Sequence, residues 1–338
     1  MLGAEERLLL KKMNARKIRN LANLWASFQW SKRSGKILHR GLPFSLSVEP
    51  TTTCNLRCPE CPSGLRSFSR PTGNMISSTL DSLLDEIGDT LSYINFYFQG
   101  EPFLNPNFLE LVHRASQSGV FCSTSTNAHY ITEKNVDEVI DSGLDKIIIS
   151  IDGTTQETYE SYRRGGRLEK VLDGSRLLVE AKKRQAAKAP HLVFQFLVVK
   201  PNEHQVPEVF ELAREIGVDE VKLKTAQLYD YENGNELMPE NEEYSRYVKG
   251  PDGKFQLKNS YEDSCWRMWQ GCVLTWDGKV VPCCFDKDAH HSLGTFPETT
   301  FKEIWRSSAY EEFRKAVFSG RDQIEICRNC TEGTKVFA

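Results

Sequence analysis

Several features that would direct a chain to a membrane or out of the cell are missing from these 338 residues. There is no stretch of about 18 consecutive apolar residues, which excludes an ordinary membrane-spanning helix. The first residues place Glu5 and Glu6 before a run of three leucines and two lysines directly after it. This pattern is too short and too charged for a secretory signal. Together these absences predict a cytoplasmic protein with no spanning segment.

Charge of one sign is not in excess either, because 43 lysines and arginines face 46 aspartates and glutamates. This balance disfavours a DNA partner, since DNA-binding surfaces are strongly basic. The exception is the segment 1–42, which has ten basic residues and two acids. Ile18, Leu21, Trp25 and Phe28 recur in it at near-helical spacing. We expect a basic amphipathic helix that docks on the rest of the protein; binding a partner or an anionic membrane surface is the alternative.

Cysteine, by contrast, is abundant and unevenly distributed. Three cysteines lie within the segment 51–64 (TTTCNLRCPECPSG), six lie between residues 265 and 330, and only Cys122 stands alone. In a reducing compartment such short spacings indicate metal or redox chemistry rather than disulfides. The ten positions are 54, 58, 61, 122, 265, 272, 283, 284, 327 and 330.

Strand-like and helix-like segments alternate from residue 44 to about residue 226. Six or so βα units in a row predict an α/β fold with a parallel sheet, open or curled into a partial (β/α)6 TIM-like barrel. The carboxyl ends of such strands carry the functional loops, so segments 54–61, 99–102, 126–127 and 150–153 are expected around one mouth. The predicted strands are 44–50, 93–100, 120–127, 145–153, 191–199 and 220–226, and the predicted helices are 77–91, 106–119, 133–143, 171–185 and 206–217.

A second, smaller module is expected towards the C-terminus. Residues 227–260 are acidic and interrupted by glycine and proline, which predicts a linker. Beyond it, residues 273–284 predict a hairpin with an Asp-Gly turn, and residues 301–320 predict an amphipathic helix. The predicted organisation is a helical extension (1–42), a barrel (43–235), a linker (236–260) and a small cysteine-rich module (261–338).

The three cysteines after the first strand, Cys54, Cys58 and Cys61, are one ligand short of a saturated 4Fe–4S cluster. A zinc site that takes a distant fourth ligand is the alternative. The pattern Cys-x3-Cys-x2-Cys in this place resembles the radical S-adenosylmethionine (SAM) family, in which the amino and carboxylate groups of SAM chelate the open iron. The resemblance implies that these cysteines hold a 4Fe–4S cluster and that SAM is the missing ligand.

Two further motifs resemble those of the radical SAM family. Gly100 and Glu101 follow the second strand and match part of the family's Gly-Gly-Glu, which holds the methionyl ammonium. Thr126 and Asn127 end the third strand, as in the family's Thr-Asn-Gly, with Ala128 in place of the glycine. The resemblance implies that Gly100, Glu101, Thr126 and Asn127 bind SAM; a surface carboxylate is the alternative for Glu101.

Three other residues resemble SAM contacts less specifically. Ser150 and Asp152 match a fourth-strand segment that reaches the ribose, although an ordinary strand-to-turn segment would look the same. Arg163 resembles an arginine that meets the methionyl carboxylate, and a solvated basic pair with Arg164 is its alternative. Glu60 departs from the family, many members of which have an aromatic residue beside the adenine.

The resemblance also implies the chemistry. In this family an electron from the cluster cleaves SAM to methionine and a 5′-deoxyadenosyl radical, which abstracts hydrogen from unactivated carbon. The protein positions the cofactor against the substrate and excludes water and oxygen. A flavodoxin or ferredoxin is the expected electron donor.

The second cysteine group resembles the SPASM module found downstream of many radical SAM enzymes. Cys265 lies ahead of Gly278, and the segment from this glycine leads to Cys283. The pattern then closes on Cys327 and Cys330, as in shorter single-cluster versions called twitch modules. The resemblance implies that Cys265, Cys283, Cys327 and Cys330 hold a second, auxiliary 4Fe–4S cluster.

The remaining cysteines have no assigned ligand role. Cys122 and Cys272 lie in strand-like segments and are expected to be packed thiols. Cys284 is either an alternative ligand to its neighbour or points away from it. In sulfatase-maturing relatives, the position of Cys284 is an aspartate that serves as the catalytic base. The nearest carboxylate here is Asp286. No catalytic acid or base is therefore assigned.

The resemblance leaves the substrate open. SPASM-type modules occur on enzymes that modify ribosomally made peptides or proteins and on enzymes that oxidise a sugar-like alcohol. RNA modification is disfavoured by the balanced charge, although the basic segment 1–42 could contact phosphates. A non-enzymatic iron–sulfur electron carrier or scaffold is the last alternative, and for it Glu101, Thr126 and Asn127 would be dispensable.

Overall fold

The computed structural model describes residues 3–259 and 261–332, and a curved sheet of eight strands lies at its centre. The strand order is β10-β9-β1-β2-β3-β4-β5-β6, in which β1 to β6 are parallel neighbours in chain order. This arrangement confirms the predicted α/β partial barrel. The strands are β1 (Ser45–Val48), β2 (Tyr93–Phe96), β3 (Phe121–Thr126), β4 (Lys146–Ser150), β5 (His191–Val198), β6 (Glu220–Thr225), β9 (Gly271–Leu274) and β10 (Val280–Val281).

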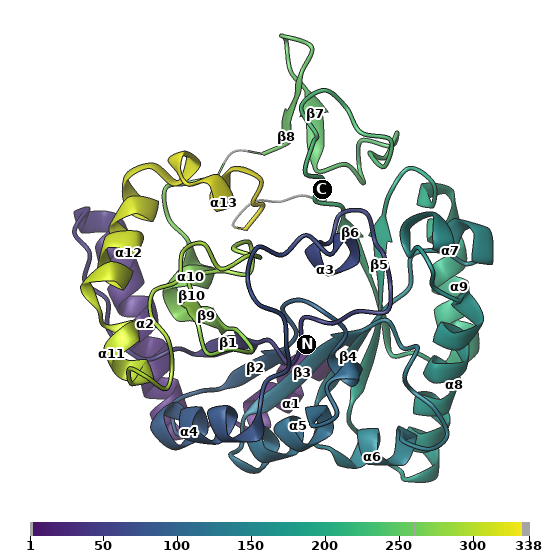
Figure 1. Ribbon diagram of the computed structural model, residues 1–338, viewed down its shortest axis with the longest axis horizontal. Helices are drawn as coiled ribbons and strands as arrows, with labels where there is room; N and C mark the ends of the chain where they lie inside the picture. Colours follow the sequence, from purple (N-terminus) through teal and green to yellow (C-terminus); the bar gives the residue numbers. More distant parts are fainter. Residues whose placement is uncertain (1–2, 260, 333–338) are drawn as a thin grey trace.

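Helices cover the convex side of the sheet, where α4, α5, α6, α8 and α9 form an outer layer (Figure 1). None of the described helices is long and apolar enough to cross a membrane. The α-helices are α1 (Ala4–Lys11), α2 (Ala15–Ser34), α3 (Pro62–Leu65), α4 (Ser77–Ile87), α5 (Phe108–Gln117), α6 (Val136–Asp141), α7 (Gln156–Tyr162), α8 (Leu168–Arg184), α9 (Val206–Ile216), α10 (Trp266–Gln270), α11 (Phe301–Trp305), α12 (Ser308–Gly320) and α13 (Glu325–Arg328). Short 3-10 turns occur at Pro102–Leu104, Glu203–Gln205 and Arg321–Gln323.

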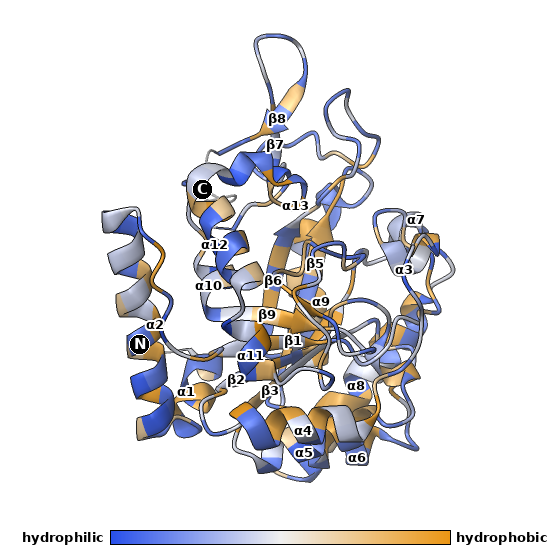
Figure 2. Cartoon of the chain, turned by 60° about the vertical axis from the view of Figure 1, so that its left-hand side comes forward, coloured by the Kyte–Doolittle hydropathy of each residue, from blue (hydrophilic) through white to orange (hydrophobic). Residues whose placement is uncertain are grey.

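Alternation along the strands separates the core from the concave face. In β1, Leu46 and Val48 are buried in the main hydrophobic core, whereas Ser45 and Ser47 line a cavity on the opposite face. Successive side chains of a strand point to opposite faces, so the same division continues along the sheet. The strands carry most of the hydrophobic colour in Figure 2, and the outer loops are largely hydrophilic. The concave face is therefore the polar one, available for a ligand.

The predicted C-terminal hairpin is present, but it is part of the main sheet rather than a separate body. Strand β9 pairs in parallel with β1, with Leu46 opposite Cys272, and β10 pairs antiparallel with β9. Gly278 turns the hairpin at φ +87°, and a Cβ there would lie 1.9 Å from the carbonyl oxygen of Phe296. The pairing brings the second cysteine group beside the first strand of the barrel.

Two other predicted elements differ from the structure. The predicted linker contains a two-stranded sheet of β7 (Tyr247–Lys249) and β8 (Phe255–Leu257), which projects from the mouth of the barrel (Figure 1). The single helix predicted for 301–320 is two helices, because Ser307 caps α12 by accepting a hydrogen bond from Tyr310 N–H. The domain boundaries stay predictions.

Helix α2 docks on the C-terminal part of the chain, as expected, but not through the predicted stripe. Leu24 and Phe28 are buried against Trp269 of α10. Ile18 and Trp25, which the helical spacing placed on the buried face, are 56% and 58% exposed. The prediction of the docking face was therefore wrong for these two residues, while Phe28 was placed correctly.

Candidate active site

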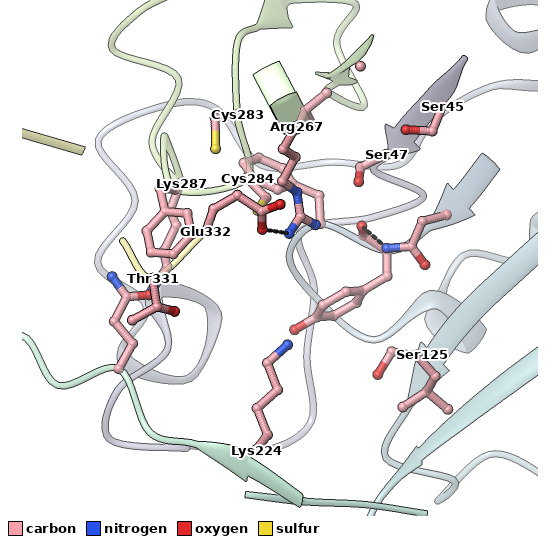
Figure 3. Close-up of a pocket in the computed structure, with 18 of the residues that line it drawn as sticks. Ser45, Ser47, Ser125, Lys224, Arg267, Cys283, Cys284, Lys287, Thr331 and Glu332 are labelled. Carbon is pink, nitrogen blue, oxygen red and sulfur yellow. Dashed lines mark hydrogen bonds and ion pairs between the residues drawn. The ribbon is translucent and has the colours of Figure 1, made fainter. Parts of the chain in front are cut away.

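A cavity of about 730 Å³ lies on the concave face of the sheet. Ser47, Asn95 and Gln195 line it from the barrel, and Arg267 and Cys284 line it from the C-terminal part of the chain. Figure 3 shows these two sides, with the labelled serines on the strands and the labelled cysteines, Lys287 and Glu332 opposite them. The volume is within the range of small-molecule and cofactor sites.

The predicted cluster loop, residues 54–61, lies at the mouth of the barrel after β1. Backbone contacts hold it in place, including the hydrogen bond from Arg57 N–H to Arg164 O at 3.0 Å. A Cβ on Gly64 would lie 2.5 Å from the backbone nitrogen and oxygen of Cys58, so only glycine allows α3 to pack this closely. These backbone contacts help to set the path of the loop.

The thiols of this loop suit a multi-iron cluster. All ten cysteines of the chain have free thiols, and Leu56 N–H lies 3.5 Å from Cys54 Sγ, directed at the sulfur. Among the described residues, no three His, Cys, Asp or Glu side chains are close enough together to hold one metal ion. In a 4Fe–4S cube each thiolate binds a separate iron, so the ligands stand further apart. Three thiols in one loop are compatible with a 4Fe–4S cluster, and the zinc alternative stays open.

Glu101 and its neighbours form a buried polar cluster beside the loop. Its carboxylate accepts hydrogen bonds from Thr126 Oγ1 and from Asn127 N–H, both at 2.7 Å. Glu101 is only 2% exposed, which contradicts the alternative of a surface carboxylate, and burial raises its pKa to about 7. Gly100 has φ +74°, and a Cβ on it would lie 2.3 Å from the carbonyl oxygen of Thr51. The lack of a side chain at Gly100 therefore lets the segment after β2 approach the backbone at Thr51, next to the cluster loop.

Arg163 connects the fourth strand to the cluster loop. Its guanidinium forms an ion pair with Asp152, and its Nη1 lies 3.9 Å from Cys58 Sγ. The side chains of Arg163 and Asp152 are 17% and 0% exposed, which contradicts the alternative of a solvated basic pair. Ser150, also buried, ends β4 on the concave face. The structure thus brings all of these predicted residues to one edge of the barrel.

These residues fit the groups that the sequence implies. Asn127 Nδ2 donates to Asn55 Oδ1 at 2.8 Å, so the Glu101 cluster is tied directly to the cysteine loop. The donors to Glu101 are neutral, and a buried carboxylate with neutral donors is complemented by an ammonium group. Arg163 places positive charge beside Cys58, as a cluster of thiolates requires. The individual ligand and SAM-binding roles stay predictions.

The four cysteines predicted for the auxiliary cluster line one small cavity. Cys265 precedes α10, Cys283 follows β10, and Cys327 and Cys330 come from α13 and the segment after it. Arg321 lies against them and donates from Nη2 to Cys330 Sγ at 3.2 Å. A buried guanidinium beside four thiols matches the negative charge of a thiolate-bound cluster, so this site also fits its predicted group.

The two adjacent cysteines have different surroundings. Cys283 lines the small cavity with the other three, whereas Cys284 lines only the large one. A hydrogen bond links the two thiols, and it lowers the pKa of Cys284 while raising that of Cys283. This geometry favours Cys283 as the ligand. Cys122 and Cys272 are buried, as expected for packed thiols.

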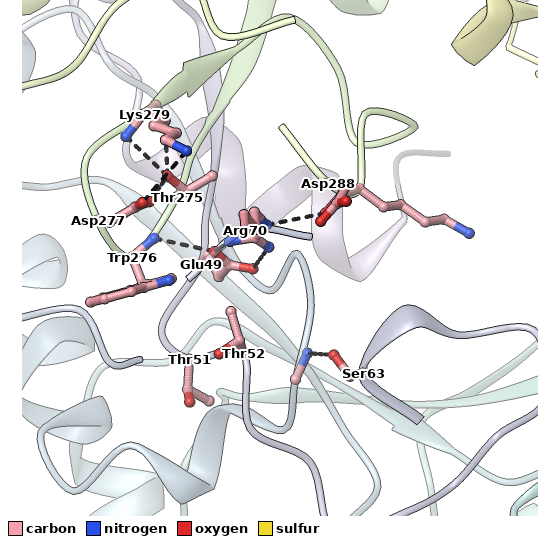
Figure 4. Close-up of polar contacts among 12 residues, drawn as sticks. Glu49, Thr51, Thr52, Ser63, Arg70, Thr275, Trp276, Asp277, Lys279 and Asp288 are labelled. Carbon is pink, nitrogen blue, oxygen red and sulfur yellow. Dashed lines mark hydrogen bonds and ion pairs between the residues drawn. The ribbon is translucent and has the colours of Figure 1, made fainter. Parts of the chain in front are cut away.

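A buried ion pair near the loop was not found from the sequence. Glu49 directly follows β1, and its oxygens accept from Arg70 Nη1 and Nη2 at 2.8 and 2.6 Å. It also accepts from Trp276 N–H in the β9–β10 turn at 3.2 Å (Figure 4). Ser69 N–H, next to the arginine, donates to Asp288 at 3.0 Å. This network joins the barrel to the C-terminal hairpin. The one clue to it in the sequence is a glutamate that directly follows a buried strand.

Comparisons with known proteins agree with this geometry. A PqqA peptide cyclase from Gluconobacter oxydans (strain 621H) is 28% identical over 316 residues, which cover 85% of this chain and 82% of that protein. An AdoMet-dependent heme synthase from Methanosarcina barkeri (strain Fusaro / DSM 804) is 26% identical, covering 85% of this chain and 87% of the relative. The crystal structure of Streptococcus suis SuiB bound to S-adenosylmethionine has a TM-score of 0.64 at 13% identity, with 96% and 80% of the two chains covered.

Two family models match separate parts of the chain. The model of the Radical SAM superfamily matches residues 48–213, and the SPASM model, an iron-sulfur cluster-binding domain, matches residues 265–331. Both matches confirm the resemblance seen in the cysteine motifs, and they imply a 4Fe–4S cluster, SAM and auxiliary iron–sulfur binding. The chain belongs to the radical SAM superfamily and is an enzyme of the group that carries a C-terminal SPASM domain.

Proposed function

We propose that this radical SAM enzyme removes a hydrogen atom from a residue of a peptide or protein. The observation that carries the proposal is the cavity of about 730 Å³, which the barrel and the SPASM domain line together. Such a cavity admits a side chain between the SAM-binding edge and the auxiliary cysteines. The relative named PqqA peptide cyclase supports a peptide rather than a free small molecule.

The chain's own residues have separate tasks in this proposal. Cys54, Cys58 and Cys61 bind the first cluster, and Glu101 accepts the ammonium group of SAM. When bound, the cluster and SAM supply a 5′-deoxyadenosyl radical that takes hydrogen from carbon. Arg163, held by its ion pair with the buried Asp152, balances charge beside Cys58 and is positioned for the SAM carboxylate.

The auxiliary site completes the proposal. Cys265, Cys283, Cys327 and Cys330 bind a second 4Fe–4S cluster, and Arg321 offsets its charge. A flavodoxin or ferredoxin as reductant, a cytoplasmic location and the absence of a DNA partner stay predictions from the sequence. Oxidation of a sugar-like alcohol is the competing reaction, and the experiments below separate the two.

The first experiment counts iron and labile sulfide in protein reconstituted without oxygen, and then measures 5′-deoxyadenosine after addition of SAM and dithionite. Two saturated clusters correspond to about eight irons per chain. We expect Cys58→Ala to remove about four irons and to abolish 5′-deoxyadenosine formation. The matched control is Cys122→Ala, which removes a buried thiol outside both groups. Full activity of Cys58→Ala would contradict the assignment of the first cluster.

The second experiment identifies the substrate class. An extract of the source organism is divided into untreated, protease-treated and nuclease-treated portions, and the added protease and nuclease are then blocked with their specific inhibitors. Each portion is then tested for stimulation of 5′-deoxyadenosine formation. A peptide or protein substrate predicts that only protease abolishes the stimulation. Stimulation that survives protease would favour the sugar-like alcohol, and loss with nuclease would favour RNA.

A further inference from the structure

The large cavity is lined by more positive than negative side chains. Its cations are Lys224, Arg246, Arg267 and Lys287, and its carboxylates are Glu60 and Glu332. Both carboxylates are already engaged, because Glu332 pairs with Arg267 and Glu60 accepts a hydrogen bond from a backbone N–H at 2.8 Å. The cavity therefore has positive charge that its own acids do not neutralise.

Lys224 is the clearest of these unneutralised cations. It lies on β6 and points into the cavity, as Figure 3 shows. No carboxylate of residues 3–259 and 261–332 forms an ion pair with it. Lys222, two residues earlier on the same face of the strand, is by contrast paired with Glu5 and Glu220 and does not line the cavity. Lys222 is thus a matched control for Lys224, because it shares the strand face but not the cavity.

Arg246 adds a second cation beside the first. It is only 6% exposed, and its guanidinium donates to two backbone carbonyls, Thr225 O at 3.4 Å and Asn329 O at 3.1 Å. Within the described part of the chain, its Nε has no hydrogen-bond partner and its charge has no carboxylate partner. A buried cation without a counter-ion is costly, and an anionic ligand would offset that cost.

The other two cations have partners of their own. Arg267 pairs with Glu332 and lies between the two cysteine-lined cavities, so its charge belongs to the auxiliary site. Lys287 lies over the ring of Tyr229, donates to its hydroxyl at 3.2 Å, and has Glu60 among the negative charges that act on it. Lys224 and Arg246 are thus the pair left for a ligand, and the arginine bonds the carbonyl of the residue next to the lysine.

We infer that Lys224 and Arg246 bind a carboxylate of the substrate, an aspartate or glutamate side chain of the peptide. This inference rests on the proposed function, and it adds the feature of the peptide that the cavity selects. An arginine and a lysine side by side recognise carboxylate oxygens through charge-assisted hydrogen bonds. The carboxylate would hold the neighbouring substrate residue against the SAM-binding edge across the same cavity.

The experiment selects peptides from an mRNA-displayed library of random dodecapeptides. The target is the fully reconstituted enzyme with SAM and without reductant, so that binding is not followed by turnover. We expect aspartate and glutamate to be enriched over the starting library with the wild-type enzyme. The same selection is made against Lys224→Gln and against the matched control Lys222→Gln.

A selected peptide is then compared with the same peptide in which its acids are replaced by the corresponding amides. The reference is the Kd of the wild-type enzyme for the acidic peptide. We expect either change alone, the amide peptide or the Lys224→Gln variant, to raise this Kd about tenfold or more. The two changes together should add little to either one, because both remove the same contact. Lys222→Gln should bind like the wild type. Iron content equal to that of the wild type shows that Lys224→Gln has not simply lost the auxiliary cluster.

Every other outcome is decisive. Enriched peptides without acids, or acids that bind equally well to Lys224→Gln, would overturn the carboxylate inference and leave the peptide proposal standing. No enrichment of any peptide by the wild-type enzyme would overturn both. If Lys224→Gln also loses iron, Arg246→Gln takes its place. With normal iron it should lose the preference for the acidic peptide, and a preference that is retained would overturn the inference for this pair. The comparison of acid and amide peptides on the wild-type enzyme needs no variant, and equal Kd values there would overturn the inference by themselves.

Discussion

Replacing Arg70 by methionine tests the ion pair that joins the barrel to the C-terminal hairpin. The side chains of Arg70 and Glu49 are 2% and 0% exposed, and two hydrogen bonds connect them. Without the arginine, the backbone N–H of Trp276 is the one donor that Glu49 keeps among residues 3–259 and 261–332. Removing one partner of a buried ion pair costs about 3–5 kcal/mol, because the other charge stays buried and unpaired.

The cost should depend on pH in a definite direction. Burial already raises the pKa of Glu49, and Arg70 opposes that effect. In Arg70→Met the opposing charge is lost, so the folded-state pKa rises further above the unfolded value. A group with a raised folded-state pKa contributes its stability at low pH and loses it as pH rises through that pKa. We therefore expect Arg70→Met to be less destabilised at low pH than at pH 8.

The measurement is urea unfolding of the metal-free, reduced protein, followed by circular dichroism at pH 5.5 and at pH 8. The double variant Glu49→Gln with Arg70→Met supplies the control, since the neutral amide can still accept from Trp276 N–H. This double variant should recover at least half of the loss. A loss below about 1 kcal/mol for Arg70→Met, or an equal loss at both pH values, would refute the reasoning.

Three further predictions concern the SAM edge and the N-terminal helix. Gly100→Ala should weaken SAM binding by tenfold or more and lower the stability, because its Cβ would lie 2.3 Å from a backbone oxygen. The control Gly119→Ala, at φ +71° but with nothing within 4 Å of its Cβ, should lower the unfolding free energy by only about 1 kcal/mol. Leu24→Ala should lower the unfolding free energy by about 2–5 kcal/mol, since Leu24 is 0% exposed. Trp25→Ala, at 58% exposure, should change it by about 0.5 kcal/mol or less. The reverse order in urea unfolding would contradict the observed docking face. The pKa of Glu101 is raised to about 7, and its ionised form is the one that accepts hydrogen bonds from the SAM amino group, so SAM affinity measured by equilibrium dialysis should fall about tenfold per pH unit below that value. Glu101→Gln should bind SAM weakly with no such dependence, and a pH-dependent variant would argue against this role.

The parts of the fold and site that could be predicted from the sequence depend on local patterns. The alternation of strand and helix patterns predicted the parallel sheet, because each βα unit is a continuous stretch of chain. The spacing of Cys54, Cys58 and Cys61 identified the cluster loop, because this motif also lies in one continuous stretch of chain. Glu101 and Asn127 were found from their resemblance to the family's Gly-Gly-Glu and Thr-Asn-Gly motifs, and the parallel sheet predicted that these loops meet at one edge.

Contacts between distant segments could not be predicted in this way. The pairing of β9 with β1 joins residues more than two hundred positions apart, and nothing in the strand pattern of 271–274 names its neighbour. Lys224 comes from a strand, and Arg246 comes from the middle of the segment 236–260 that was predicted to be a linker. Their surplus charge is visible only when the lining of one cavity is considered together.

Helix α2 shows why the hydrophobic pattern can select the wrong face. Its buried residues Lys17, Asn20 and Ser27 are polar, so the docking face has a lower count of apolar residues than the outer stripe. Each of these polar groups meets a partner: Lys17 Nζ donates to a backbone carbonyl at 2.6 Å, Asn20 forms two hydrogen bonds of 2.8 Å with the backbone of residue 42, and Ser27 Oγ accepts from Trp269 Nε1 at 3.2 Å. Burying a polar group that is hydrogen-bonded costs little, so a satisfied polar face can dock as well as an apolar one. A helical period alone finds stripes of apolar residues, and it cannot find the backbone groups that make a polar stripe the better fit.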